Sequence, residues 1–253
     1  RQEVRVVGDV QGLIHTAGAL VSVDQDYNVA WHAPGDVFAA TTREKSYTAV
    51  SMLPVFTVEQ LQAAGTDYPD WVQGRYLWLP DTVPSRVIAL ARDLTATEPT
   101  PYDRAYALET YLRTFTYTLD VPAPPADRDV ADYFLFELQE GYCDYYASSM
   151  VVLARSVGLP ARLGVGYLAK RPDENGQQVI TQKDGHSWAE VYFAGYGWVE
   201  FEPTAAFPTA VEDGRGFTIP LEDQDDDLFP STDLPRPPPI PEQVDEQIYY
   251  GQW

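Results

Sequence analysis

Residues 140–147 read EGYCDYYA, and this stretch decides the fold because it places Cys143 at the start of a predicted helix. Met150 and Ala154 continue the helical pattern, and Gly158 ends it. A cysteine in the first turn lies at the positive end of the helix dipole, which favours the thiolate. Its backbone N–H is also a candidate oxyanion donor. Taken alone, the same cysteine is equally well explained as a small buried hydrophobic residue.

A histidine further along the chain favours the catalytic interpretation. His186 begins a predicted strand, and Glu202 follows the next strand. A three-residue loop between the strands pairs Phe193 with Gly197 and puts Glu202 on the diagonal from His186, about 7–8 Å away between backbones. A four-residue loop would put the two on opposite faces unless a bulge intervened. The spacing therefore permits the pair without requiring it.

Together these side chains form a nucleophile, a base and an orienting acid. Imidazole takes the thiol proton, a carboxylate fixes the imidazole tautomer, and the thiolate attacks a carboxamide to form a thioester. Glu202 is the predicted acid, and Glu190 and Glu200 are rival acids that are more simply explained as solvated or hydrogen-bonded strand residues.

Four sequence blocks resemble those of the transglutaminase-like superfamily, in particular its bacterial membrane-anchored members. The blocks are EGYCDYYA at 140–147, GLPAR at 158–162, GHSWAEV at 185–191 and GWVEFEPT at 197–204. The resemblance covers about residues 76 to 207, beginning at YLWLP (76–80). It implies thiol-dependent acyl transfer on protein glutamine or peptide amides, with Cys143 as nucleophile, His186 as base and Glu202 as orienting acid.

The family usually has aspartate where this chain has Glu202. The extra methylene displaces the carboxylate by roughly 1.5 Å, on the scale at which positioning affects rate. Two other functions are therefore kept. One is a cysteine peptidase or amidase on the same site. The other is a non-catalytic interaction domain of a membrane protein, since a fold does not determine function.

The order of elements predicts an α+β fold. Helices come before an antiparallel sheet, as in the papain-like core of the superfamily, in which the cysteine helix packs on the sheet. Residues 1–75 read as a β-rich N-terminal subdomain, 76–207 as the catalytic core, and 208–253 as an acidic, proline-rich linker. Within the core, a turn at 173–176 (DENG) is predicted to return through a strand at 179–181.

Charge and composition limit the partners. The net charge of −21 argues against nucleic acid and against an anionic membrane surface, because phosphates would be repelled. One cysteine excludes an internal disulfide and a Cys-rich zinc site, and no cofactor is expected. The resemblance implies an extracytoplasmic domain tethered to a membrane, with a protein or peptide substrate, such as one from the cell envelope.

The remaining motifs are better explained without chemistry. The acidic run at 223–227 (DQDDD) lacks the central glycine and terminal glutamate of a calcium loop. The aromatic end at 249–253 (YYGQW) is a weak candidate membrane anchor. His15 and His32 have no nearby cluster of partners in the sequence, so they are interpreted as structural.

Overall fold

The computed structural model describes residues 1–7, 12–33, 36–169 and 172–208. The predicted linker after residue 208 lies outside these ranges, as do the acidic run at 223–227 and the aromatic end at 249–253. Within the described ranges, no helix is both long and apolar enough to cross a bilayer. The predicted boundaries near residues 75 and 207 stay predictions.

The N-terminal part is built from five strands. They are β1 (Gln2–Arg5), β2 (Ala19–Val23), β3 (Asn28–Ala33), β4 (Asp36–Thr41) and β5 (Ser46–Met52). Strands β1, β5 and β2 form one antiparallel sheet in that order, and β3 and β4 form a separate hairpin. The strands end at Met52, and we call residues 1–52 the N-terminal β region.

Two helices lie inside the segment that the sequence analysis assigned to a β-rich subdomain. They are α1 (Val58–Gln62) and α2 (Asp70–Tyr76). Thr57 accepts a hydrogen bond from the Gln60 N–H, and the Gln60 side chain accepts one from the Thr57 N–H. This reciprocal capping box was the local signal for a helix start. The strands in residues 1–75 therefore end at Met52, and two helices follow them.

The predicted helices of the core are present. They are α3 (Ser85–Leu94), α4 (Pro101–Leu112), α5 (Val130–Tyr133) and α6 (Cys143–Ser156). A π-helical turn, Phe134–Leu138, follows α5 and leads to β7 (Glu140–Gly141), which pairs in parallel with the earlier strand β6 (Thr116–Tyr117). Thr100 caps α4 by accepting from the Asp103 N–H, as its position before a proline predicted.

The core sheet has the order β10-β9-β8 and is antiparallel throughout. Its strands are β8 (Ala161–Tyr167), β9 (Gly185–Phe193) and β10 (Gly197–Phe201). Gly197 pairs with Phe193, so the β9–β10 loop has three residues, as one of the two registers considered had predicted. Gly195 and Gly197 have φ values of 83° and 87°, which favour glycine in this tight connection.

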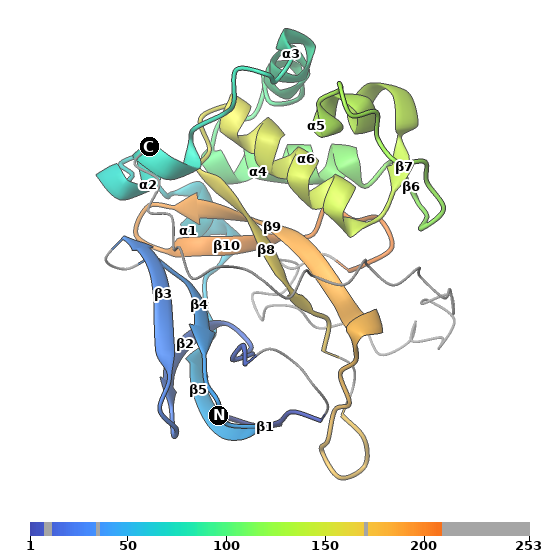
Figure 1. Ribbon diagram of the computed structural model, residues 1–253. Coiled ribbons are helices and arrows are strands. Elements are labelled where there is room, and N and C mark those ends of the chain that lie inside the picture. Colours follow the sequence, from blue (N-terminus) through green and yellow to red (C-terminus); the bar gives the residue numbers. More distant parts are fainter. Residues whose placement is uncertain (8–11, 34–35, 170–171, 209–253) are drawn as a thin grey trace, which may run out of the picture. The chain divides into compact units, whose positions relative to one another are not determined.

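The predicted strand at 179–181 is wrong. β8 pairs directly with β9, and the described residues between them lie outside the sheet, in a connection that ends in a 3₁₀ turn at Gln182–Asp184 (Figure 1). The predicted turn is present, because the Asp173 N–H donates to the Gln177 carbonyl at 2.7 Å. Val179 and Ile180 are 77% and 46% exposed, and no strand pairs with residues 179–181 within the part of the chain that the structure describes.

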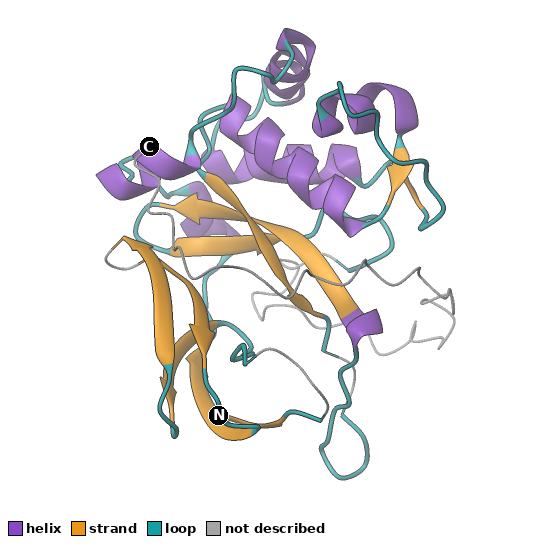
Figure 2. Cartoon of the chain, in the orientation of Figure 1, coloured by secondary structure: helices purple, strands orange, loops and turns teal. Residues whose placement is uncertain are grey.

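Helix α6 packs across β9 and β8 (Figures 1 and 2), and this layer of helix on sheet encloses the core. Most of the largest buried apolar side chains come from α4, α6, the π-helical turn and the sheet, among them Leu108, Leu112, Phe134, Tyr146, Met150, Leu153, Phe193 and Phe201. The α+β, papain-like architecture is confirmed. It fixes the start of α6 against the start of β9.

Candidate active site

Cys143 is the first residue of α6, and Tyr142 before it is extended. The β6–β7 ladder holds the approach to this position, because the Thr118 N–H donates to the Gly141 carbonyl at 2.9 Å. The first N–H groups of a helix have no acceptor within the helix, so they and the dipole favour a negative charge here. The thiol is half-buried. Cys143 therefore lies at the positive end of the α6 dipole.

His186 and Glu202 form a buried pair. His186 Nε2 lies 2.5 Å from Glu202 Oε2, and the two residues are 5% and 0% exposed. The β9–β10 register ends with Phe201 opposite Ala189, so Glu202 continues it to the diagonal position predicted from the three-residue loop. Of the two rival acids, Glu190 accepts a hydrogen bond from Arg162.

Burial and two neighbouring groups determine the charge of His186. Burial lowers the pKa of its imidazole, but hydrogen bonds to Cys143 and Glu202 and the charges of both groups outweigh burial and raise this pKa to about 9. The imidazolium is therefore the favoured form at neutral pH. A histidine held between a thiol and a carboxylate in this way can keep the thiol proton as part of an ion pair.

Glu202 is fixed by contacts from its own segment and from α4. Its Oε1 accepts from the Thr204 N–H at 2.8 Å, and its backbone N–H donates to Glu109 Oε1 at 2.7 Å. Arg113 donates to the carbonyls of Glu202, Thr204 and Phe207 at 2.7, 3.0 and 2.7 Å. Both carboxylate oxygens are therefore bonded, and the longer side chain of glutamate reaches the imidazole.

Aromatic rings surround the imidazole. Phe207 lies 4.5 Å from His186 between ring centroids, and Tyr117 meets Phe207 edge-on at 5.7 Å. Burial, followed by the charges of Cys143 and Glu202, raises the pKa of Tyr117 to about 12, so its phenol stays protonated. Rings at these separations exclude water from the imidazole, which strengthens its electrostatic interactions.

Asp144 connects α6 to β9. Its Oδ1 accepts a hydrogen bond from the Ser187 hydroxyl at 2.7 Å and lies 3.9 Å from Cys143 Sγ. This contact joins the residue after the cysteine to the residue after the histidine. It therefore fixes the start of α6 relative to β9, the two elements that carry Cys143 and His186.

The structure brings together the three residues predicted from the sequence, Cys143, His186 and Glu202. It also shows supporting residues that sequence reasoning missed, in particular Glu109 and Arg113. Glu109 lies in α4 and Arg113 is its C-cap, about 90 residues before the segment they hold, and no local pattern links them to it. Their i, i+4 spacing on a helix is a signal only of an ordinary surface ion pair.

His15 and His32, which the sequence predicted to be structural, contact aromatic rings away from Cys143. His15 meets Tyr167 edge-on at 5.2 Å, and His32 stacks on Phe38 at 4.2 Å. Among the described residues, no group of three His, Cys, Asp or Glu side chains could hold a metal ion.

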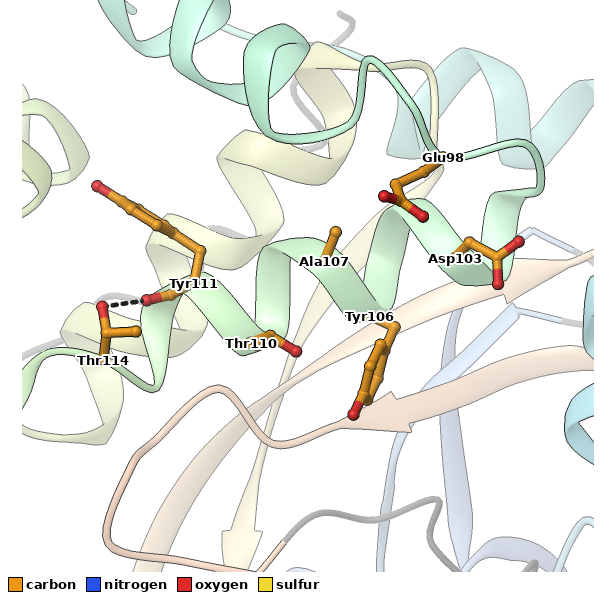
Figure 3. A pocket seen from close by; sticks show the side chains of 7 residues that line it. All are labelled: Glu98, Asp103, Tyr106, Ala107, Thr110, Tyr111 and Thr114. Atoms are coloured by element: carbon orange, nitrogen blue, oxygen red, sulfur yellow. Dashed lines mark hydrogen bonds between the residues drawn. The ribbon is translucent and has the colours of Figure 1, made fainter.

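A separate hollow runs along α4 and contains none of the three site residues (Figure 3). It is lined by Glu98, Asp103, Tyr106, Ala107, Thr110, Tyr111 and Thr114. The hydrogen bond drawn there joins the Thr114 hydroxyl to the Tyr111 carbonyl. Helix α4 thus presents this face to solvent while Glu109 and Arg113 hold the segment after β10.

Comparisons with known proteins agree with this geometry. Residues 88–203 match the model of the transglutaminase-like superfamily. The chain is 38% identical over 201 residues to "Uncharacterized protein YebA" of Bacillus subtilis, covering 74% of this chain and 27% of YebA. It is 34% identical over 144 residues to a protein-glutamine gamma-glutamyltransferase of Pseudomonas aeruginosa, covering 55% of this chain and 21% of that protein. It spans about a quarter of the length of these relatives.

A solved structure shares the fold over most of the chain. It is the periplasmic domain of TgpA from Pseudomonas aeruginosa bound to ethylmercury, with a TM-score of 0.60 and 25% identity. The match covers 79% of this chain and 69% of that one. It includes more of the chain than the family model does.

Proposed function

Because residues 88–203 belong to the transglutaminase-like superfamily, we propose that this chain transfers acyl groups from protein glutamine or peptide amides through a thioester on Cys143. The observation that carries the proposal is the buried His186–Glu202 pair at 2.5 Å, whose imidazole is also hydrogen-bonded to Cys143. A nucleophile, a base and an orienting acid in contact are the arrangement that activates a thiol.

The reaction begins with a proton transfer. Since Nε2 of His186 is engaged by Glu202, its Nδ1 takes the proton of Cys143. The thiolate attacks the carboxamide carbon of the substrate, and the carbonyl electrons move onto oxygen. The N–H groups at the start of α6, including that of Cys143, are placed to stabilise this oxyanion. When the oxyanion collapses, the C–N bond breaks, the imidazolium protonates the leaving nitrogen, and ammonia departs from a glutamine side chain.

The second half of the reaction regenerates the thiol. His186 accepts a proton from an incoming primary amine or water, which attacks the thioester carbon. The C–S bond then breaks, and Cys143 leaves as a thiolate paired with the imidazolium. An amine gives a new amide, whereas water gives a glutamate side chain. Glu202 accepts the hydrogen bond from the Nε2–H throughout the reaction, so the imidazole keeps one orientation.

Two relatives support a substrate class and a location. A relative named as a protein-glutamine gamma-glutamyltransferase supports glutamine side chains as acyl donors. The structural match to a periplasmic domain supports an extracytoplasmic site of action, and hence a protein or peptide of the cell envelope as substrate. The net charge of −21 favours a basic or neutral substrate over an acidic one.

The test is incubation with a glutamine-containing peptide and a labelled primary amine, followed by mass spectrometry of the peptide and an ammonia assay. We expect the amine to be attached to the glutamine side chain, one ammonia to be released for each amide exchanged or hydrolysed, and Cys143→Ser to abolish both. Backbone cleavage without side-chain modification would identify a peptidase instead. If neither reaction occurs across a panel of peptides, the non-catalytic alternative is supported.

A further inference from the structure

Trp188 lies flat on the core sheet beside His186. In the β8–β9 register, Gly164 pairs with Trp188 and Gly166 with His186. A Cβ atom at position 164 would lie 2.4 Å from the indole Nε1, and one at position 166 would lie 3.0 Å from Cη2. The indole therefore occupies the space that side chains at these two positions would need, and β8 needs glycine there.

A carboxylate fixes the rotation of the indole. The Trp188 Nε1–H donates to Glu190 Oε1 at 3.3 Å, and Glu190 Oε2 accepts from Arg162 Nε at 2.5 Å. Both oxygens of Glu190 are thus engaged, one by the indole and one by the guanidinium. The Arg162 guanidinium also lies over the Trp198 ring, 4.2 Å from its centroid, which restricts its movement.

The same arginine reaches the N-terminal β region. Arg162 Nη1 lies 3.4 Å from Oδ1 of Asp36, which is 1% exposed. Asp36 Oδ2 accepts from the Tyr76 hydroxyl at 2.6 Å and lies 3.5 Å from His32 Nδ1. A buried carboxylate at the start of β4 is therefore held in place by β3, α2 and β8. Side-chain contacts run without a break from Asp36 through Arg162 and Glu190 to the indole.

The indole and the imidazole are close enough to restrict each other. Their ring centroids are 6.4 Å apart with 25° between the planes, while Phe207 lies on the imidazole at 4.5 Å. The carboxylates near this face are Glu190, Glu200 and Glu202, and of these only Glu202 bonds the imidazole in the contacts described above. The orientation of the imidazole thus depends on aromatic packing as well as on its acid.

We propose that Trp188 is a positioning residue for His186, and that the N-terminal β region supports this role by holding Arg162 through Asp36. The proposal rests on the proposed function, because it gives the imidazole a catalytic task. It assigns to residues 1–52 a role that the sequence did not suggest. Loosening the indole lets the imidazole turn away from Cys143 and Glu202, which weakens the contacts that raise its pKa and misplaces the base.

The first experiment displaces the indole, together with its hydrogen bond to Glu190, by a change on the neighbouring strand β8. Gly164→Ala places a methyl group against Nε1, and Gly74→Ala is the control because open space surrounds position 74 in α2. The readout is the rate of Cys143 alkylation by iodoacetamide against pH, which needs no substrate. For Gly164→Ala we expect the basic midpoint to fall from about 9 by about half a pH unit or more, and acyl transfer to fall about tenfold or more in kcat with little change in KM.

The second experiment tests the link to the N-terminal β region. Glu190→Gln, Asp36→Asn and their combination are compared by the same alkylation profile, with folding checked by circular dichroism. We expect both single variants to lower the basic midpoint, and the double variant to lower it by less than the sum. Arg162→Lys keeps the charge but loses the forked contact, so it replaces Asp36→Asn if that variant does not fold.

Specific results would overturn the proposal. A wild-type alkylation profile in Gly164→Ala and Glu190→Gln would show that Trp188 only packs the sheet. The N-terminal β region would have no part in positioning His186 under either of two results. One is that the midpoint shifts of Glu190→Gln and Asp36→Asn add fully in the double variant. The other is that the folded Asp36→Asn or Arg162→Lys protein shows no midpoint shift. Because alkylation reports the Cys143–His186 pair directly, these results stay readable even if no peptide is found to acylate the enzyme.

Discussion

Glu202 occupies the position at which the family usually has aspartate, and its surroundings explain how the longer side chain is accommodated. Oε2 meets His186, Oε1 meets the Thr204 N–H, and the backbone on either side is held by Glu109 and Arg113. The backbone of this segment is therefore fixed at a distance from the imidazole that suits glutamate. Aspartate at this position would lose its contact with the imidazole unless the backbone segment moved toward His186.

The first prediction concerns this acid. Glu202→Gln should lower single-turnover acylation of Cys143 by about a hundredfold or more, because an amide cannot offset the imidazolium charge. Glu202→Asp should retain part of the activity, since it keeps the charge while shortening the reach. Acylation of Cys143 by a glutamine peptide is measured in rapid-quench samples of the three proteins. If Glu202→Gln acylates at the wild-type rate, another group orients His186.

The second prediction concerns the thiol and its partner. The imidazole pKa of about 9 keeps the imidazolium present at neutral pH, so wild-type Cys143 should react readily with iodoacetamide near pH 6. His186→Ala should slow that reaction at least about tenfold, because the stabilising cation is removed. His15→Ala is the control histidine. Equal rates in the wild type and His186→Ala would show that the two side chains do not interact.

At the scale of single elements, much of the site was predictable from the sequence. The start of α6 at Cys143 follows from its apolar spacing and the Gly158 stop, and the β9–β10 register follows from a three-residue loop between Phe193 and Gly197. These features are local, so the chain itself encodes them. The capping box that starts α1 is equally local, because it lies within Thr57 to Gln60.

The long connection between β8 and β9 shows where local reasoning fails. Residues 179–181 have strand composition, yet β8 already takes up the free edge of β9, and the segment has no partner strand among the described residues. Strand propensity measures how well a side chain fits a sheet surface, which has to be available. Contacts between distant segments, such as α4 with residues 202–207, are invisible to periodicity for the same reason.

The third prediction concerns α4 and that distant segment. Arg113→Ala removes three charge-assisted hydrogen bonds to the carbonyls of Glu202, Thr204 and Phe207, so it should lower the free energy of unfolding by about 2–4 kcal/mol. It should also slow acylation, because Glu202 loses its support. Urea unfolding and single-turnover acylation give the two values. Arg92→Ala, an exposed arginine on α3, is the control. Unchanged stability in Arg113→Ala would show that the segment is held by other contacts.

For the whole molecule, charges buried on the core sheet make stability depend on pH. Burial, then the charges of Glu190 and Glu202, raise the pKa of Glu200 to about 7 from 4.5. A glutamate with a raised pKa binds its proton more tightly in the folded state. Its contribution is therefore complete below pH 4.5 and is lost as pH rises through 7. His186, raised from 6.5 to about 9, contributes fully below pH 6.5 and loses that contribution as pH rises through 9.

The fourth prediction follows from Glu200. Glu200→Gln cannot ionise, so this variant should be more stable than the wild type at pH 7.5 and similar to it at pH 4.5. The free energy of unfolding between pH 4.5 and 7.5 should therefore fall less steeply in Glu200→Gln. Urea unfolding at four pH values measures the slope, and the exposed strand residue Glu3→Gln is the control. If Glu200→Gln leaves the slope of the unfolding free energy against pH unchanged, other groups cause the pH dependence.

The central claim is that Cys143 carries the acyl group, and intact-protein mass spectrometry tests it most directly. The enzyme is mixed with excess glutamine peptide at acidic pH without an amine. The mixture is quenched within seconds, and the intact mass of the protein is measured. The account predicts one adduct equal to the peptide mass less ammonia, located on Cys143 by peptide mapping, removed by hydroxylamine, and absent from His186→Ala. An enzyme that turns the peptide over without any adduct on Cys143, or with an adduct on another residue, would contradict the account.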